Sequence, residues 1–78
     1  MDPAVVTDHG VVLFHTTSAA LRAEKVLAKI GASVRLVPTP RDLSSDCGVA
    51  VRFDWAQVEA VTAALADAGV EPAGIHRR

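Results

Sequence analysis

The chain has 78 residues and a mass of 8.2 kDa, which is material for one domain, because domains typically hold about 100–150 residues. Half of the residues are hydrophobic and 22% are charged, a composition that indicates a folded chain rather than a disordered one. A chain this short leaves little material for walls around a deep cleft. These features favour a carrier, a binding module or a subunit over a two-lobed enzyme.

The charge and hydropathy patterns disfavour several kinds of partner. Eight Lys and Arg residues against nine Asp and Glu residues leave a net charge of −1, and the chain has two Phe, one Trp and no Tyr. Binders of nucleic acid need a basic surface or a row of stacking aromatic rings, so we expect no nucleic-acid partner and interpret Arg77 and Arg78 as a solvated tail. No apolar run exceeds four residues, which predicts neither a membrane segment nor a secretory signal.

The single cysteine and the three histidines limit the chemistry further. Cys47 has no second cysteine with which to form a disulfide within the chain, which suits a reducing compartment, and we expect a cytoplasmic protein. His9, His15 and His76 are too widely spaced in the sequence for a metal signature, and one cysteine makes no CxxC site. We therefore expect no metal and no cofactor.

The N-terminal part of the chain predicts a short lead-in and then a strand. Residues 1–9 mix Pro, Asp and Val and are expected to be an N-terminal lead-in to a single domain at residues 10–78. Residues 11–15 are rich in β-branched and apolar residues at both odd and even positions. This pattern is typical of a central strand that is covered on both faces.

A helix and a second strand are predicted next. Hydroxyl residues at 16–18 supply helix-capping groups, with Ser18 as the expected cap. Apolar residues then recur at helical spacing until Gly31, a usual stop signal at a helix C-terminus. Residues 33–37 alternate as a second strand, and Pro38 cannot donate to a strand ladder.

The C-terminal half predicts another strand, a second helix and a weak edge strand. Residues 49–53 alternate, and Asp54 with Gln57 three positions later forms the sequence pattern of a capping box. The second helix ends at Gly69. Residues 70–76 contain Pro and Gly and are expected to form only an edge strand.

This order of elements predicts an α+β fold. A right-handed crossover in each strand-helix-strand unit is satisfied most simply by the ferredoxin-like βαββαβ arrangement, a four-stranded antiparallel sheet of order 4-1-3-2 with both helices on one face. In this topology the end of the first strand, the start of the first helix, the long 38–48 loop and the start of the third strand converge at one end of the sheet.

Cys47 is the strongest candidate for a reactive residue. It lies in the long loop beside Gly48 and, in the predicted topology, near the N-terminus of the first helix. Backbone amides and the helix dipole at that terminus, together with Arg41, favour a thiolate, whereas Asp46 opposes it. Alternatively, Cys47 shares the parity of the inward-facing residues of the following strand and is a small buried hydrophobe.

The rest of the long loop allows two interpretations. Two prolines with Ser44 and Ser45 would frame a small anion or the tail of a partner, with Arg41 supplying the charge. The same residue types are also typical of an ordinary stiff turn. His15 either reaches the loop as a base for Cys47, or packs or faces solvent at the end of its strand.

The loop and its neighbouring elements resemble a known family. The residues that carry the resemblance are Val12-Leu13-Phe14, 16–24, Leu27 and the run Pro-Thr-Pro-Arg-Asp-Leu-Ser-Ser-Asp-Cys-Gly-Val-Ala-Val-Arg-Phe at 38–53. They are similar to the small bacterial domains named Se/S carrier protein-like, over nearly the whole chain. The most specific part is the proline-flanked arginine followed by Ser-Ser-x-Cys-Gly. Asp42-Leu43 stands where Glu-Ile is the commoner pair.

The resemblance implies a carrier rather than a stand-alone enzyme. It places the carrier cysteine at Cys47, whose thiolate would accept sulfane sulfur or zero-valent selenium and hold it as a persulfide or selenopersulfide. Donor and acceptor proteins, with a cysteine desulfurase as one donor, are the implied partners. The residues assigned to partner or anion contacts and to stabilising the thiolate are Arg41, Ser44, Ser45, Gly48, Thr16, Thr17 and Ser18.

An interaction or ligand-sensing module without catalysis is the alternative hypothesis. The sheet face that the helices leave uncovered would expose Val37, Ala50 and part of the first strand, which a monomer rarely leaves in water. A homodimer is compatible with both hypotheses. Substitution of Cys47 would abolish transfer by a carrier and leave partner binding by a module intact.

Overall fold

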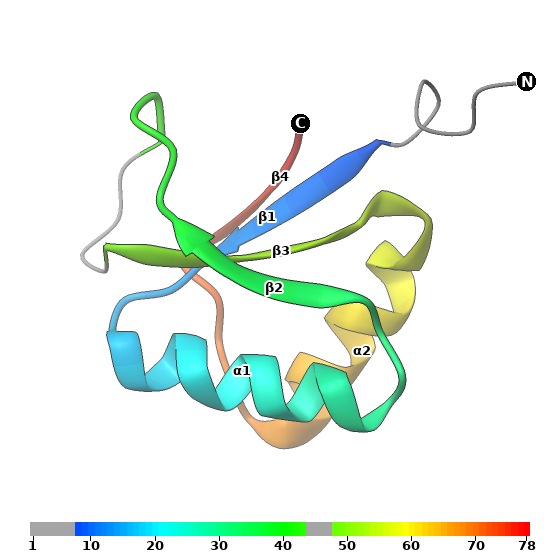
Figure 1. Cartoon of the computed structure of the whole chain (residues 1–78). Coiled ribbons are helices and arrows are strands. Elements are labelled where there is room, and N and C mark those ends of the chain that lie inside the picture. The colour runs from blue at the N-terminus through cyan, green and yellow to red at the C-terminus, as the bar shows by residue number, and fades with distance from the viewer. Residues whose placement is uncertain (1–7, 44–47) are drawn as a thin grey trace, which may run out of the picture.

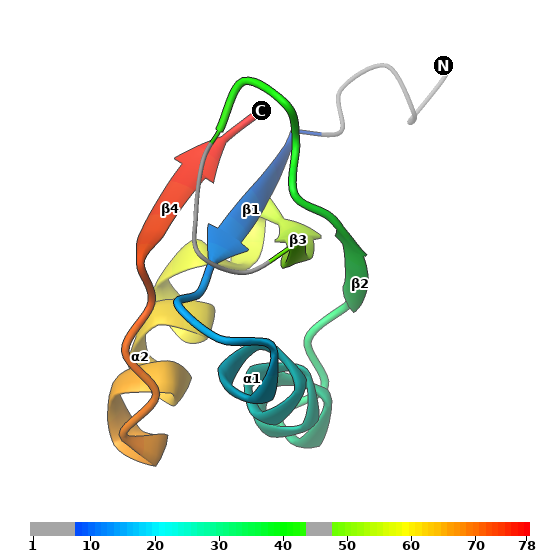
Figure 2. The ribbon, with the colours of Figure 1, turned by 90° about the vertical axis from the view of Figure 1, so that its left-hand side faces the viewer.

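The computed structural model describes residues 8–43 and 48–78. Its elements, in chain order, are β1 (His9–Leu13), α1 (Thr17–Lys29), β2 (Val34–Pro38), β3 (Val49–Asp54), the short 3-10 helix η2 (Trp55–Gln57), α2 (Val58–Ala68) and β4 (Gly74–Arg77). The strands form one open sheet, and both helices pack against the same face of it (Figures 1 and 2). The fold is therefore α+β, as predicted.

The sheet is antiparallel throughout, with β1 and β3 in its centre. β1 pairs with β3 and β4, and β3 also pairs with β2. Counted from the β2 edge the order is 2-3-1-4, whereas the sequence predicted 4-1-3-2; the neighbouring pairs are the same when the count starts from the β4 edge. The ferredoxin-like assignment stays a prediction.

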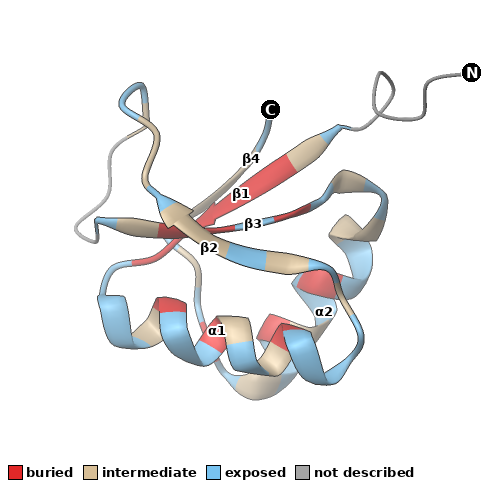
Figure 3. Ribbon diagram, in the orientation of Figure 1, coloured by how far each residue is buried: buried red, intermediate tan, exposed pale blue. Residues whose placement is uncertain are grey.

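The main core lies between the sheet and the two helices. Its largest members are Phe14 and Phe53, which are fully enclosed together with Leu27 and Leu65. Figure 3 shows buried residues on the two central strands and on the inner sides of both helices. Gly10 belongs to this packing, because a Cβ there would lie 2.5 Å from the Phe53 ring.

A second, smaller cluster lies on the opposite face of the sheet. Val11, Leu13 and Ala50 are buried there, and Val37 and Leu43 pack against them. The prediction that Ala50 and part of the first strand lie exposed on an uncovered face is wrong, since Ala50 has no accessible surface and Val11 and Leu13 are each only 3% exposed. Leu43 belongs to the loop after β2, so part of this face is covered by that loop.

The helix boundaries differ from the prediction in two places. Thr16, not Ser18, caps α1: its side-chain oxygen accepts a hydrogen bond from the Ala19 amide. Asp54 does cap the following segment, but Gln57 does not complete a capping box. The Gln57 side-chain oxygen instead accepts a hydrogen bond from the Ser33 amide, which ties η2 to the start of β2.

Candidate functional site

Three strand ends meet at one end of the sheet, as the topology predicted. Leu13, the last residue of β1, is opposite Ala50 of β3, and Pro38, the last residue of β2, is opposite Val49. The Thr39 amide donates a hydrogen bond to the Gly48 carbonyl at 3.1 Å and extends this pairing into the loop. α1 begins a few residues after β1 at the same end (Figure 2).

The predicted nucleophile and two of its neighbours cannot be placed. Cys47, Ser44 and Ser45 lie outside the described residues. Gly48, which follows Cys47, is exposed and has no heavy atom within 4 Å of the position that a Cβ would take. A side chain at position 48 would therefore meet no described residue.

The N-terminus of α1 is organised by Thr16. The Ala19 amide donates to the Thr16 side chain at 3.1 Å, and the Ala20 amide donates to the Thr16 carbonyl at 3.2 Å. The expectation that the amides following Ser18 are available to stabilise a thiolate is therefore wrong for these two amides. Thr17 and Ser18 themselves are exposed at this end of the molecule.

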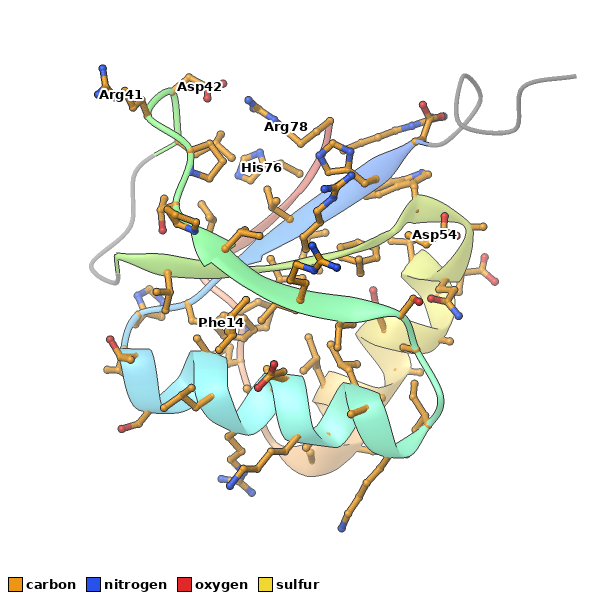
Figure 4. The ribbon with its side chains drawn as sticks, in the orientation of Figure 1. Phe14, Arg41, Asp42, Asp54, His76 and Arg78 are labelled. Atoms are coloured by element: carbon orange, nitrogen blue, oxygen red, sulfur yellow. The ribbon has the colours of Figure 1, made fainter. Side chains whose placement is uncertain are left out.

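The described part of the loop is a tight turn with two charged residues, of which one is exposed at the tip and the other forms an ion pair. The Leu43 amide donates to the Pro40 carbonyl at 3.0 Å, which closes the turn. Arg41 is exposed at the tip, points away from the body of the domain and forms no ion pair with any described residue (Figure 4). Asp42 instead points toward Arg78 and accepts two hydrogen bonds from its guanidinium, at 2.7 and 2.9 Å.

The Asp42–Arg78 pair holds the loop to the residue after β4. The hydrogen bonds from Arg78 lower the pKa of Asp42, and the Asp42 carboxylate raises the pKa of Arg78. Arg77 and Arg78 are exposed, as the interpretation of a solvated tail implies, but Arg78 is also tied to the loop by this pair. Arg77 also forms an ion pair, with Asp8, and its guanidinium lies 5.6 Å from the centre of the Trp55 ring.

Sequence reasoning missed Asp42, Leu43 and Arg78 as the residues that hold the loop. Asp42 and Arg78 are 36 positions apart, and nothing in their local patterns pairs them. Leu43 could have been noticed as the one large apolar residue in a polar turn segment. Arg41, the charge that the sequence did single out, lies beside this anchor.

Neither a metal centre nor a membrane-spanning helix is found in the described parts of the chain. Within residues 8–43 and 48–78, no group of acidic and histidine side chains gathers that could hold a metal ion. In the same ranges, no helix is long and apolar enough to cross a membrane. His15 is exposed in the connection between β1 and α1.

Comparison with known protein families decides the classification. The model of the family described as Putative Se/S carrier protein-like matches residues 9–77. The chain belongs to this family. The match to the Se/S carrier-like domain runs from the first residue of β1 to the last residue of β4, so it covers every element described above. No curated protein and no solved structure matches the chain at a significant level.

Membership of this Se/S carrier-like family draws attention to the loop that contains the only cysteine of the sequence. The family's name refers to carriage of selenium or sulfur, and the single cysteine of the chain lies in the loop between Leu43 and Gly48. Both of these flanking residues have defined contacts, Leu43 with the cluster on the sheet and Gly48 with Thr39. In the sequence, Cys47 therefore lies between two residues with defined contacts, Leu43 and Gly48.

Proposed function

We propose that this Se/S carrier-like domain carries sulfur or selenium on Cys47 and passes it to a second protein. The observation that supports the proposal most is the family match over residues 9–77, because Cys47 is the only thiol in the chain. The fixed positions of Leu43 and Gly48 on either side of the cysteine segment support it further.

The transfer is an exchange of one sulfur–sulfur bond for another. The Cys47 thiolate attacks the terminal sulfur of a donor persulfide, a new bond forms between the Cys47 sulfur and that atom, and the donor's sulfur–sulfur bond breaks. The donor leaves as a thiolate, and Cys47 becomes a persulfide. No net oxidation occurs, and a selenium atom bound to a donor sulfur follows the same scheme.

The surrounding residues have proposed roles that follow from their placement. The exposed guanidinium of Arg41 recognises the acidic surface of a partner or its leaving thiolate, with Ser44 and Ser45 beside it in sequence. Open space at Gly48 lets the partner approach Cys47. Thr17 and Ser18 border this approach from α1.

The partners proposed for this carrier are a donor of the cysteine desulfurase class and an acceptor protein. A cytoplasmic setting would keep the thiol reduced. We also propose that the fold is ferredoxin-like, a proposal that its order of elements and its strand pairs support. Carriage on one thiol requires no second copy of the chain, and sedimentation at high concentration tests the proposed homodimer directly.

Mass spectrometry of the intact protein tests the carrier function. After incubation with a cysteine desulfurase and cysteine, we expect a mass gain of one sulfur atom, and with selenocysteine a gain of one selenium atom. Cys47→Ser should show no gain, and Arg41→Gln should gain the atom more slowly because the loop loses its exposed charge. An active donor that leaves the wild-type mass unchanged would disprove the proposal.

The pH dependence of Cys47 alkylation is the first measurement to make. Iodoacetamide reacts with the thiolate, so the folded protein is compared with a denatured control. An apparent pKa below the ordinary thiol value of about 8.5 supports a usable nucleophile. Alkylation only after denaturation would identify Cys47 as a core residue.

A further inference from the structure

Two arginines are directly opposite each other on the face of the sheet away from the helices. Arg35 of β2 and Arg52 of β3 are Cα partners in the ladder, so their side chains leave the sheet on the same side, with Cβ atoms about 5 Å apart. Both are exposed. Like charges directly opposite in a sheet destabilise it, so the repulsion between the two arginines opposes folding.

Neither arginine of this pair forms an ion pair with an acidic residue in the described ranges. Arg77 binds Asp8 and Arg78 binds Asp42, whereas neither Arg35 nor Arg52 takes part in an ion pair within residues 8–43 and 48–78. The two guanidiniums are therefore not neutralised by a direct ion pair within these ranges. An arginine fork presents several N–H donors at once and matches oxyanions in two-point contacts.

The pair borders a shallow open cavity of about 360 Å³. His9 of β1 and Ser33, just before β2, also line it, and each can donate a further hydrogen bond from its side chain. Asp54 lines it too, but one of its carboxylate oxygens accepts a hydrogen bond from the Ala56 amide as the cap of η2. Two arginines against one aspartate leave the cavity positive, and its volume is at the small end for ligand sites.

We propose that this cavity binds a small oxyanion of the phosphate class, free or as part of a small ester. Arg35 and Arg52 bind the anion from two sides, and its charge removes the repulsion between them. His9 and Ser33 complete the contacts at the rim. The proposal goes beyond carriage of sulfur or selenium, because none of these four residues belongs to the loop that holds Cys47.

Nuclear magnetic resonance provides the test, with inorganic phosphate as the probe. Phosphate is added to ¹⁵N-labelled wild-type protein while sodium chloride keeps the ionic strength constant. We expect saturable shifts of the backbone amides of His9, Arg35 and Arg52. Each of the variants Arg35→Gln and Arg52→Gln removes one charge-assisted contact and should bind phosphate about tenfold more weakly or worse.

Lys25→Gln is the matched control, since it removes an exposed positive charge of α1 outside the cavity and should bind phosphate like the wild type. Without phosphate, Arg35→Gln and Arg52→Gln should be at least as stable as the wild type in urea, which separates lost binding from lost folding. The proposal is overturned if the three amides do not move, or if Lys25→Gln weakens binding as much as the cavity variants. Shifts caused by oligoglutamate or a single-stranded oligonucleotide but not by phosphate would also overturn it. Its failure would leave the result of the mass-spectrometric test unaffected.

Discussion

Phe14 is the largest side chain that the sheet and helices enclose completely, and it points from the end of β1 toward α1 (Figure 4). Replacing it by alanine should cost about 3–5 kcal/mol, because the cavity cannot collapse fully. That loss is comparable to the whole stability of many small domains. Urea unfolding of Phe14→Ala checks this, with Leu21→Ala as control. Leu21 lies on α1 with 45% of its surface exposed, and its loss should change stability by about 0.5 kcal/mol or less.

Gly10 and Gly48 differ in the space that surrounds them, and substitution by alanine tests this difference. A Cβ at Gly10 would lie 2.5 Å from the Phe53 ring and 2.7 Å from the Trp55 ring, so both aromatic residues must shift, at a cost of about 1–3 kcal/mol. A Cβ at Gly48 meets nothing within 4 Å. Thermal unfolding should show a lower Tm for Gly10→Ala only. Equal Tm values for the two variants would contradict the packing at Gly10.

At the scale of elements, the start of α1 gives a direct test of which hydroxyl caps the helix. Thr16→Ala removes the acceptor of the Ala19 amide and should destabilise the protein by about 1 kcal/mol. Ser18→Ala is the matched control, because Ser18 is within the helix and exposed, and its replacement should be close to neutral. Chemical denaturation of both variants decides between Thr16 and the predicted Ser18. A larger loss from Ser18→Ala would contradict the observed cap.

The helices and strands could be predicted because their apolar residues repeat with the period of each element. β3 alternates along 49–53, and α2 buries Val61 and Leu65 on one side. Gln57 was misassigned because its spacing from Asp54 fits a local capping box, while the structure uses it for a contact with Ser33, 24 positions away. A local pattern cannot predict which distant amide approaches such a side chain.

The Asp42–Arg78 ion pair makes the attachment of the loop to the end of the chain dependent on pH. Arg78 lowers the pKa of Asp42 below its ordinary 3.8 in the folded protein, so the contribution of this pair is complete above that value. It is lost as the pH falls through the lower folded-state pKa. Both side chains are partly exposed, so the effect on global stability is small. The position of the loop should respond more clearly.

Amide shifts of Leu43 and Arg78 measured between neutral and strongly acidic pH check this. We expect both to change together below pH 3.8 as Asp42 is protonated, and we expect Asp42→Asn to show the acid-type shifts already at neutral pH. Asp67→Asn, at an exposed position of α2, should follow the wild type. Shifts in Asp42→Asn identical to those of the wild type at every pH would contradict a loop held by this pair.

The candidate site could be predicted from the sequence in its position but only partly in its contacts. The convergence of the ends of β1 and β2 with the start of β3 follows from the order of elements and the handedness of crossovers. The cover over Ala50 and the attachment of Asp42 to Arg78 depend on how the loop folds back over the sheet. That path is set by tertiary contacts, which neither composition nor periodicity contains.

The place of β4 beside β1 has a consequence for aggregation. β1 and the residue after it form the apolar run Val-Val-Leu-Phe, and β4 occupies the side of β1 that β3 leaves open. β4 has only four residues, and without it that run would present an unpaired, apolar strand edge to other chains. Such edges template intermolecular sheets. The short last strand thus keeps this apolar run from pairing with other copies of the chain.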